Sequence, residues 1–150
     1  MKKIYLDYNH ARLDTHIAVF HQMPVLLEML SAMQIPLGVV TSKSRFAAMR
    51  NLRDFDLERY FRIVIAKEST MKHKPDPEPL LEAMRQLGLC KPDRVIYVGD
   101  SMHDLNSAKR AGCRSAIVDW TVMPAEELLA AKPDLWLKNP GQLLEYLSCL

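Results

Sequence analysis

The segment Val98-Gly99-Asp100-Ser101-Met102-His103-Asp104 decides the fold of this chain. It follows the apolar run 94–98, which is typical of a buried parallel strand, and it leads into a helix predicted over 102–111. The carboxylate of Asp100 is therefore expected at the carboxyl end of a strand, where open α/β sheets bind ligands. Asp104 falls in the first turn of the helix. A capping box with Ser101 would explain Asp104 alone, but it would not explain Asp100.

Two earlier segments carry further polar side chains at the ends of predicted elements. Val39-Val40-Thr41-Ser42 closes an apolar run with two hydroxyls, and Lys72-His73-Lys74-Pro75-Asp76-Pro77 places a lysine just before a helix. With the two acids, these residues supply a donor to phosphate oxygens, a cation and carboxylates for a hard metal ion. Taken singly, each has a simpler interpretation: Thr41 and Ser42 as caps of the helix near residue 44, and Lys74 as a solvated loop lysine.

Strands and helices alternate along the chain. Helical spacing of apolar residues, caps and breakers predicts helices over 23–34, 44–52, 77–87, 102–111, 124–130 and 141–147. Short apolar runs predict strands over 37–40, 62–66, 94–98, 115–118 and 135–137. Strands separated by helices indicate an α/β fold, a doubly wound parallel sheet in a single domain.

Composition narrows the class of protein. The chain has 150 residues, of which 49% are hydrophobic and 25% charged, enough for one buried core. The net charge is only +2, and acids interrupt the basic stretch over 43–62, which favours a solvated helix face over nucleic-acid binding. The cysteines at 90, 113 and 149 have neither disulfide nor zinc spacing. Without a membrane span or a secretory signal, we expect a cytoplasmic protein.

The ordered segments Val-Val-Thr-Ser-Lys, His-Lys-Pro-Asp-Pro-Glu-Pro and Val-Gly-Asp-Ser-x-x-Asp resemble motifs II, III and IV of the haloacid dehalogenase (HAD) superfamily. The chain is most similar to its phosphoglycolate phosphatase and inorganic pyrophosphatase branch. The resemblance implies a Rossmann-like core and a Mg²⁺-dependent hydrolase that moves a phosphoryl group through an aspartyl-phosphate. Its partner would be a small phosphorylated metabolite or pyrophosphate, with neither nucleic acid nor membrane, and a homodimer stays open.

The resemblance also assigns roles to residues. Thr41, with Ser42 beside it, would hold a phosphate oxygen. Lys74 would neutralise the phosphate and the nucleophile. Asp100 would ligate Mg²⁺, supported by Asp104.

Motif I of the family, Asp-x-Asp-Gly-Thr, has no clear counterpart, and residues 1–20 allow two interpretations. In one, residues 2–6 form the first strand and Asp7-Tyr8-Asn9-His10-Ala11 is an eroded motif I with Asp7 as the nucleophile. Asn9 then lacks the carboxyl that acid and base catalysis needs. In the other, which we favour, residues 5–20 are a remnant of a cap helix and 21–150 form the core domain, with the cap largely or wholly absent.

Two functions follow from these interpretations. The first is a phosphohydrolase that is incomplete in this chain, and the alternative is a catalytically silent domain that binds phosphate or Mg²⁺. If residues 5–20 are helical, the strands 37–40 and 95–98 would face a missing central strand. We expect them to close directly on each other, or residues 2–6 to insert, in preference to a segment donated by a neighbouring molecule.

Overall fold

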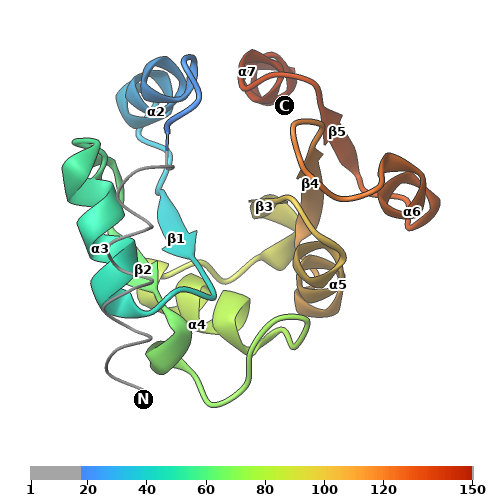
Figure 1. The fold of residues 1–150 in the computed structure, drawn as a ribbon, viewed down its shortest axis with the longest axis horizontal. Coiled ribbons are helices and arrows are strands. Elements are labelled where there is room, and N and C mark those ends of the chain that lie inside the picture. The colour runs from blue at the N-terminus through green and yellow to red at the C-terminus, as the bar shows by residue number, and fades with distance from the viewer. Residues whose placement is uncertain (1–17, 150) are drawn as a thin grey trace.

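The computed structural model describes residues 18–149, and all predicted strands and helices are present with boundaries within two residues of those expected. The elements are drawn in Figure 1. In chain order they are α2 (Met23–Ala32), β1 (Gly38–Val40), α3 (Arg45–Asp54), β2 (Ile63–Ile65), α4 (Glu78–Leu87), β3 (Ile96–Gly99), α5 (Met102–Ala111), β4 (Arg114–Val118), α6 (Ala125–Ala130), β5 (Leu135–Leu137) and α7 (Gly141–Ser148). Short 3₁₀ turns cover Glu58–Tyr60, Lys67–Ser69 and Pro92–Arg94.

All strand pairs are parallel, which confirms the predicted α/β fold. Within residues 18–149, however, the strands form two sheets, β1-β2 and β3-β4-β5. The expectation that β1 and β3 close directly on each other is therefore wrong. Insertion of residues 2–6 concerns residues outside the described part of the chain.

Helices cover both faces of the strands, as a doubly wound arrangement requires. On one face, Leu80 and Met84 of α4 pack with Ala108 of α5, and Val40 of β1 and Tyr97 of β3 join the same apolar cluster. On the other face, a cluster from α2, β4, β5 and α7 comprises Leu26, Leu30, Ala116, Leu137 and Leu143. The first cluster contains residues of both sheets, so side-chain packing connects β1 to β3.

Helix ends follow local backbone chemistry. Gly88 and Gly112 adopt left-handed φ angles of 70° and 76° directly after α4 and α5, as predicted for C-terminal glycines. Helix α2 ends at Ala32, two residues before the predicted end, because Gln34 has a φ of 59° that no helix residue adopts. Asp76 does not occupy the cap position itself, which is Pro77, but its carboxylate accepts the N–H of Glu78.

The basic stretch over 43–62 lies at the surface beside acidic residues, as its composition predicts. Arg53 pairs with Glu58 and Arg59 with Asp56 around the end of α3, so the basic stretch is a solvated face with neighbouring acids. Between residues 18 and 149, no helix has the length and apolarity to cross a membrane. Of the segment 1–20, only residues 18–20 are described, and they lie outside any helix.

Candidate active site

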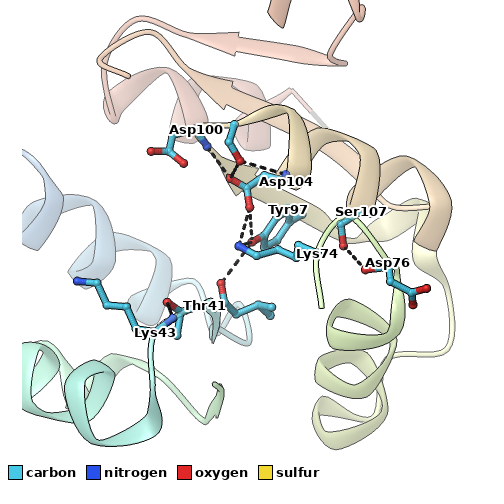
Figure 2. Close-up of polar contacts among 10 residues, drawn as sticks. Thr41, Lys43, Lys74, Asp76, Tyr97, Asp100, Asp104 and Ser107 are labelled. Carbon is cyan, nitrogen blue, oxygen red and sulfur yellow. Dashed lines mark hydrogen bonds and ion pairs between the residues drawn. The ribbon is translucent and has the colours of Figure 1, made fainter. Parts of the chain in front are cut away.

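The predicted site residues meet at the carboxyl ends of the strands. Thr41 follows β1, Asp100 follows β3, and Lys74 comes from the loop before α4. Figure 2 shows Lys74 between the end of β1 and the start of α5. The buried hydroxyl of Ser107 on α5 donates to the carbonyl oxygen of Asp76 at 2.9 Å and so anchors the lysine loop to that helix.

A buried ion pair between Lys74 and Asp104 forms the centre of the site. Lys74 Nζ lies 2.6 Å from Asp104 Oδ1, and the two side chains are only 12% and 6% exposed. The ammonium group also donates to the hydroxyl of Tyr97 at 3.0 Å. The interpretation of Lys74 as a solvated loop lysine is therefore wrong.

Asp104 combines the two roles that the sequence left as alternatives. Its Oδ2 accepts hydrogen bonds from the backbone N–H of Asp100 at 3.1 Å and from Ser101 Oγ at 2.8 Å. Ser101 caps α5 and accepts the N–H of Asp104 at 3.3 Å. The capping arrangement is present, and the other carboxylate oxygen still holds Lys74. Both oxygens of Asp104 are therefore engaged by the protein itself.

Gly99 makes room for this carboxylate. A Cβ atom at residue 99 would lie 2.3 Å from Cβ and 2.8 Å from Oδ2 of Asp104. Atoms at such separations overlap, so any larger residue would push Asp104 out of its place above the strand end. The glycine of the quoted motif is thus required by packing.

The environment separates the acidities of the two aspartates. Burial favours the neutral form of Asp104, but the hydrogen bond and charge of Lys74, together with Ser101 and the N–H of Asp100, hold its pKa at about 2. The pKa of Asp100 is raised, first by partial desolvation of its carboxyl and then by the neighbouring Asp104. Near neutral pH, Asp104 is ionised and paired with Lys74.

We expect this pair to make stability depend on pH in the acid range. Since the pKa of Asp104 is lower in the folded chain than its ordinary value of 3.8, its contribution is full above about pH 4 and is lost as the pH falls through 2. The contribution is about 2 kcal/mol. Urea unfolding between pH 5 and pH 2 should show a shallower loss of stability for Asp104→Asn than for the unchanged chain. Equal slopes would contradict this account.

Asp100 is placed differently from Asp104. The residue is exposed, and Figure 2 shows its carboxylate turned away from the pair of Lys74 and Asp104. Its carbonyl oxygen accepts a hydrogen bond from Thr121 Oγ1 at 2.8 Å, which fixes the turn after β3. Among residues 18–149, no three His, Cys, Asp or Glu side chains gather in a way that could hold a metal ion.

The hydroxyls after β1 do not cap α3. That cap is Ser44, whose Oγ accepts the N–H of Ala47 at 3.3 Å, so the capping interpretation of Thr41 and Ser42 is wrong. Thr41 Oγ1 accepts the N–H of Lys43 at 3.1 Å, and no acceptor between residues 18 and 149 takes its own proton, which could therefore serve a ligand. Thr41, Ser42 and Lys74 line one small pocket, together with Val40, Ala66, Lys67, Thr70, His73 and Pro79.

Among residues 18–149, the lining of that pocket has basic and hydroxyl side chains and no carboxylate, which suits an anion. Its volume of about 10 Å³ admits about one water molecule, so a phosphoryl group would not fit without rearrangement of the lining.

The sequence pattern does not mark Tyr97, Ser101 or Gly99 as site residues. Tyr97 lies in the middle of an apolar run, which predicts only a place in the strand. A signal was present, because a buried tyrosine hydroxyl requires a hydrogen-bond partner.

Comparison with known proteins identifies the family. The family model described as haloacid dehalogenase-like hydrolase matches residues 1–118. The chain belongs to this family. The match confirms the resemblance based on Thr41, Lys74 and Asp100.

Curated HAD-family relatives carry the name PpaX. The PpaX protein of Caldanaerobacter subterraneus subsp. tengcongensis is 39% identical over 148 residues, which cover 99% of this chain and 67% of that protein. The pyrophosphatase PpaX of Bacillus velezensis is 33% identical over 144 residues, 96% of this chain and 66% of the relative. The chain thus spans about two thirds of the length of the curated relatives it matches.

Solved structures of HAD-family proteins share the fold. A predicted phosphoglycolate phosphatase from Haemophilus somnus superposes with a TM-score of 0.87 at 25% identity, covering 97% of this chain and 64% of that one. A HAD-superfamily hydrolase of subfamily IA from Geobacter sulfurreducens has a TM-score of 0.71 at 28% identity, with 84% of this chain and 59% of the other covered. The two sheets of this chain therefore belong to a HAD-like core.

Proposed function

We propose that this chain forms the core of a Mg²⁺-dependent phosphohydrolase that acts on pyrophosphate or small phosphate esters through an aspartyl-phosphate. The observation that carries the proposal is the largely buried Lys74, held 2.6 Å from Asp104 beside the pocket that Thr41 and Ser42 also line. An ammonium group fixed in this way can neutralise a phosphoryl group without the entropy that a surface lysine would lose. Pyrophosphate is favoured as substrate because the relative from Bacillus velezensis is named a pyrophosphatase.

Each side chain has a part in the proposed reaction. The Thr41 hydroxyl, with Ser42 beside it, would donate to a phosphate oxygen. Lys74 would balance the charge of the phosphoryl group and of the attacking carboxylate. Mg²⁺ supplies charge neutralisation at the phosphate oxygens when it is bound.

The residues at the end of β3 suit a hard metal ion. Asp100 offers exposed carboxylate oxygens, the ligand type that Mg²⁺ prefers. Asp104 would act on the metal indirectly, because its oxygens are taken by Lys74, Tyr97, Ser101 and the N–H of Asp100. We therefore propose Asp100 as the ligand and Asp104 as its support.

The attacking carboxylate would come from Asp7 or from a strand supplied by a segment outside residues 18–149. The strand edges support a need for such a strand. Thr41 N donates to Ile65 O and Arg62 N to Leu37 O, so residues 37, 39 and 41 direct their peptide groups toward β2. Gly38 and Val40 then direct theirs away from β2, as the alternation along a strand requires. A strand beside β1 would pair with these groups and end next to Thr41.

We expect Mg²⁺ to bind weakly through Asp100. One or two carboxylates leave most positions to water, so isothermal titration calorimetry should give a dissociation constant on the order of millimolar or weaker. The variant Asp100→Asn should abolish the measurable heat of binding.

The matched control is Asp93→Asn, which removes another exposed carboxylate, in the turn before β3, and should leave the titration unchanged. Tight binding that survives Asp100→Asn would contradict the assignment.

A further inference from the structure

Tyr97 connects the two halves of the candidate site through a single hydroxyl group. The residue belongs to β3, and its side chain lies in the apolar cluster that it shares with Val40 of β1. Its hydroxyl lies 3.0 Å from Lys74 Nζ, 3.1 Å from Asp104 Oδ1 and 3.3 Å from the carbonyl oxygen of Val40. Figure 2 shows the ring reaching the space between Lys74 and the end of β1.

The chemistry of these groups sets the direction of each hydrogen bond. Lys74 carries three N–H donors and no acceptor, so the phenol oxygen accepts from the ammonium group. The single phenol proton is then available to either Asp104 Oδ1 or Val40 O, which are at similar distances. Two of the three ammonium protons of Lys74 are committed, to Asp104 and to Tyr97. Within residues 18–149 the third has no hydrogen-bond partner and could serve a ligand oxygen.

The contact with Val40 matters because β1 and β3 do not pair. Thr41 follows Val40 directly, so the Val40 carbonyl has a fixed relation to the hydroxyl that lines the pocket. The phenol hydroxyl is a polar link between the strand that carries Thr41 and the strand that leads to Asp100. A further strand beside β1 would donate a backbone N–H to the Val40 carbonyl oxygen. In that case the Tyr97 hydroxyl would donate to Asp104 Oδ1 and would still accept from Lys74 Nζ.

We propose that Tyr97 is a positioning residue for phosphoryl binding, which orients the ammonium group of Lys74 through the hydrogen bond between them. This inference rests on the proposed function. Tyr97 itself would contact no substrate. Its effect would pass through Lys74, whose third proton could point in many directions if Asp104 were its only partner.

The test compares Tyr97→Phe with a control that loses a similar group elsewhere. Tyr60 is that control, because its hydroxyl also accepts from a cation, Arg59, and donates to a carboxylate, Glu28, both at 2.8 Å. The first readout is the ¹⁵N-detected ammonium signal of Lys74, assigned with Lys74→Arg. We expect a slowly exchanging signal in the unchanged chain and in Tyr60→Phe, and its loss in Tyr97→Phe.

The second readout is affinity for inorganic phosphate at saturating Mg²⁺. Loss of one hydrogen bond to a charged group corresponds to about a tenfold change in affinity. We expect about tenfold weaker binding for Tyr97→Phe, no change for Tyr60→Phe, and an Mg²⁺ affinity within about twofold of the unchanged chain in both. A general loss of structure would weaken the binding of phosphate and of Mg²⁺ together. A loss of phosphate affinity with unchanged Mg²⁺ affinity therefore indicates a positioning role for Tyr97.

Three results would overturn the proposal: an ammonium signal that survives in Tyr97→Phe, an unchanged phosphate affinity, or an equal loss of phosphate and Mg²⁺ affinity. If Tyr97→Phe does not fold, a measurement on the unchanged chain still tests whether Tyr97 contacts Lys74. A nuclear Overhauser effect between the Lys74 ammonium protons and the Tyr97 ring then supports the contact, and its absence refutes it. If the unchanged chain binds no phosphate, the proposed function fails, whereas the ammonium signal still decides whether Tyr97 holds Lys74.

Discussion

Replacement of Lys74 by methionine is expected to lower the free energy of unfolding by about 3 to 5 kcal/mol, the cost of leaving one partner of a buried ion pair alone. Asp104 is 6% exposed, and its carboxylate would lose the cation that lies 2.6 Å away. Methionine keeps most of the volume of lysine, so the effect reports the charge and not a cavity. Urea denaturation near pH 7 measures it.

Two further variants show whether the loss of stability comes from the ion pair between Lys74 and Asp104. Lys72→Met is the control in the same loop, because that side chain is 71% exposed and its pairing with Asp76 at 3.6 Å lies at the surface. It should cost at most about 1 kcal/mol. The double variant Lys74→Met with Asp104→Asn should recover much of the loss, since neither charge remains buried alone. A loss below about 1 kcal/mol for Lys74→Met would show that the pair is not buried in solution.

The second large effect concerns catalysis. We expect the chain to hydrolyse acetyl phosphate and p-nitrophenyl phosphate slowly or not at all, and pyrophosphate at least about 10²-fold more slowly than the pyrophosphatase PpaX of Bacillus velezensis. General acid and base catalysis alone is worth about 10²- to 10⁴-fold. The segment Asp7-Tyr8-Asn9-His10-Ala11 has Asn9 where the family motif places the acid and base. Steady-state phosphate release with Mg²⁺ measures the rates.

Two substitutions decide between the interpretations of the N-terminal segment. If residues 7–11 act as motif I, Asn9→Asp should raise turnover by up to about 10²-fold, and Asp7→Asn should abolish it. If the segment is a cap remnant, neither substitution changes the rate. Robust Mg²⁺-dependent turnover that Asp7→Asn removes would refute the cap interpretation and identify Asp7 as the nucleophile.

The predicted elements depended on signals that act over a few residues. Gly88 and Gly112 end helices because only a residue without a Cβ adopts the left-handed conformation at no cost, and that property belongs to the residue type. The alternation of apolar runs and helical spacing indicated parallel strands, which place Thr41 and Asp100 at strand ends. These features need no knowledge of distant contacts.

The sheet was harder to predict. Whether β1 closes on β3 depends on pairing between segments more than fifty residues apart, which no local pattern contains. The structure keeps the two sheets separate and connects them by side chains, with Tyr97 reaching Val40 at 3.3 Å. A hydroxyl within an apolar run gives no sign of its partner until the chain is folded.

By itself, the sequence determined the α/β class, the order of the elements, the family and the residue types of the site, because spacing and motif chemistry are properties of neighbouring residues. Only the tertiary structure decided the state of Lys74, which the sequence left between a solvated loop and a site. Its burial follows from four elements meeting around one ammonium group: the loop before α4, the end of β1, Tyr97 on β3 and Asp104 on α5. Burial of a charge is set by what surrounds it in space, and the charge is stable there only because Asp104 is buried with it.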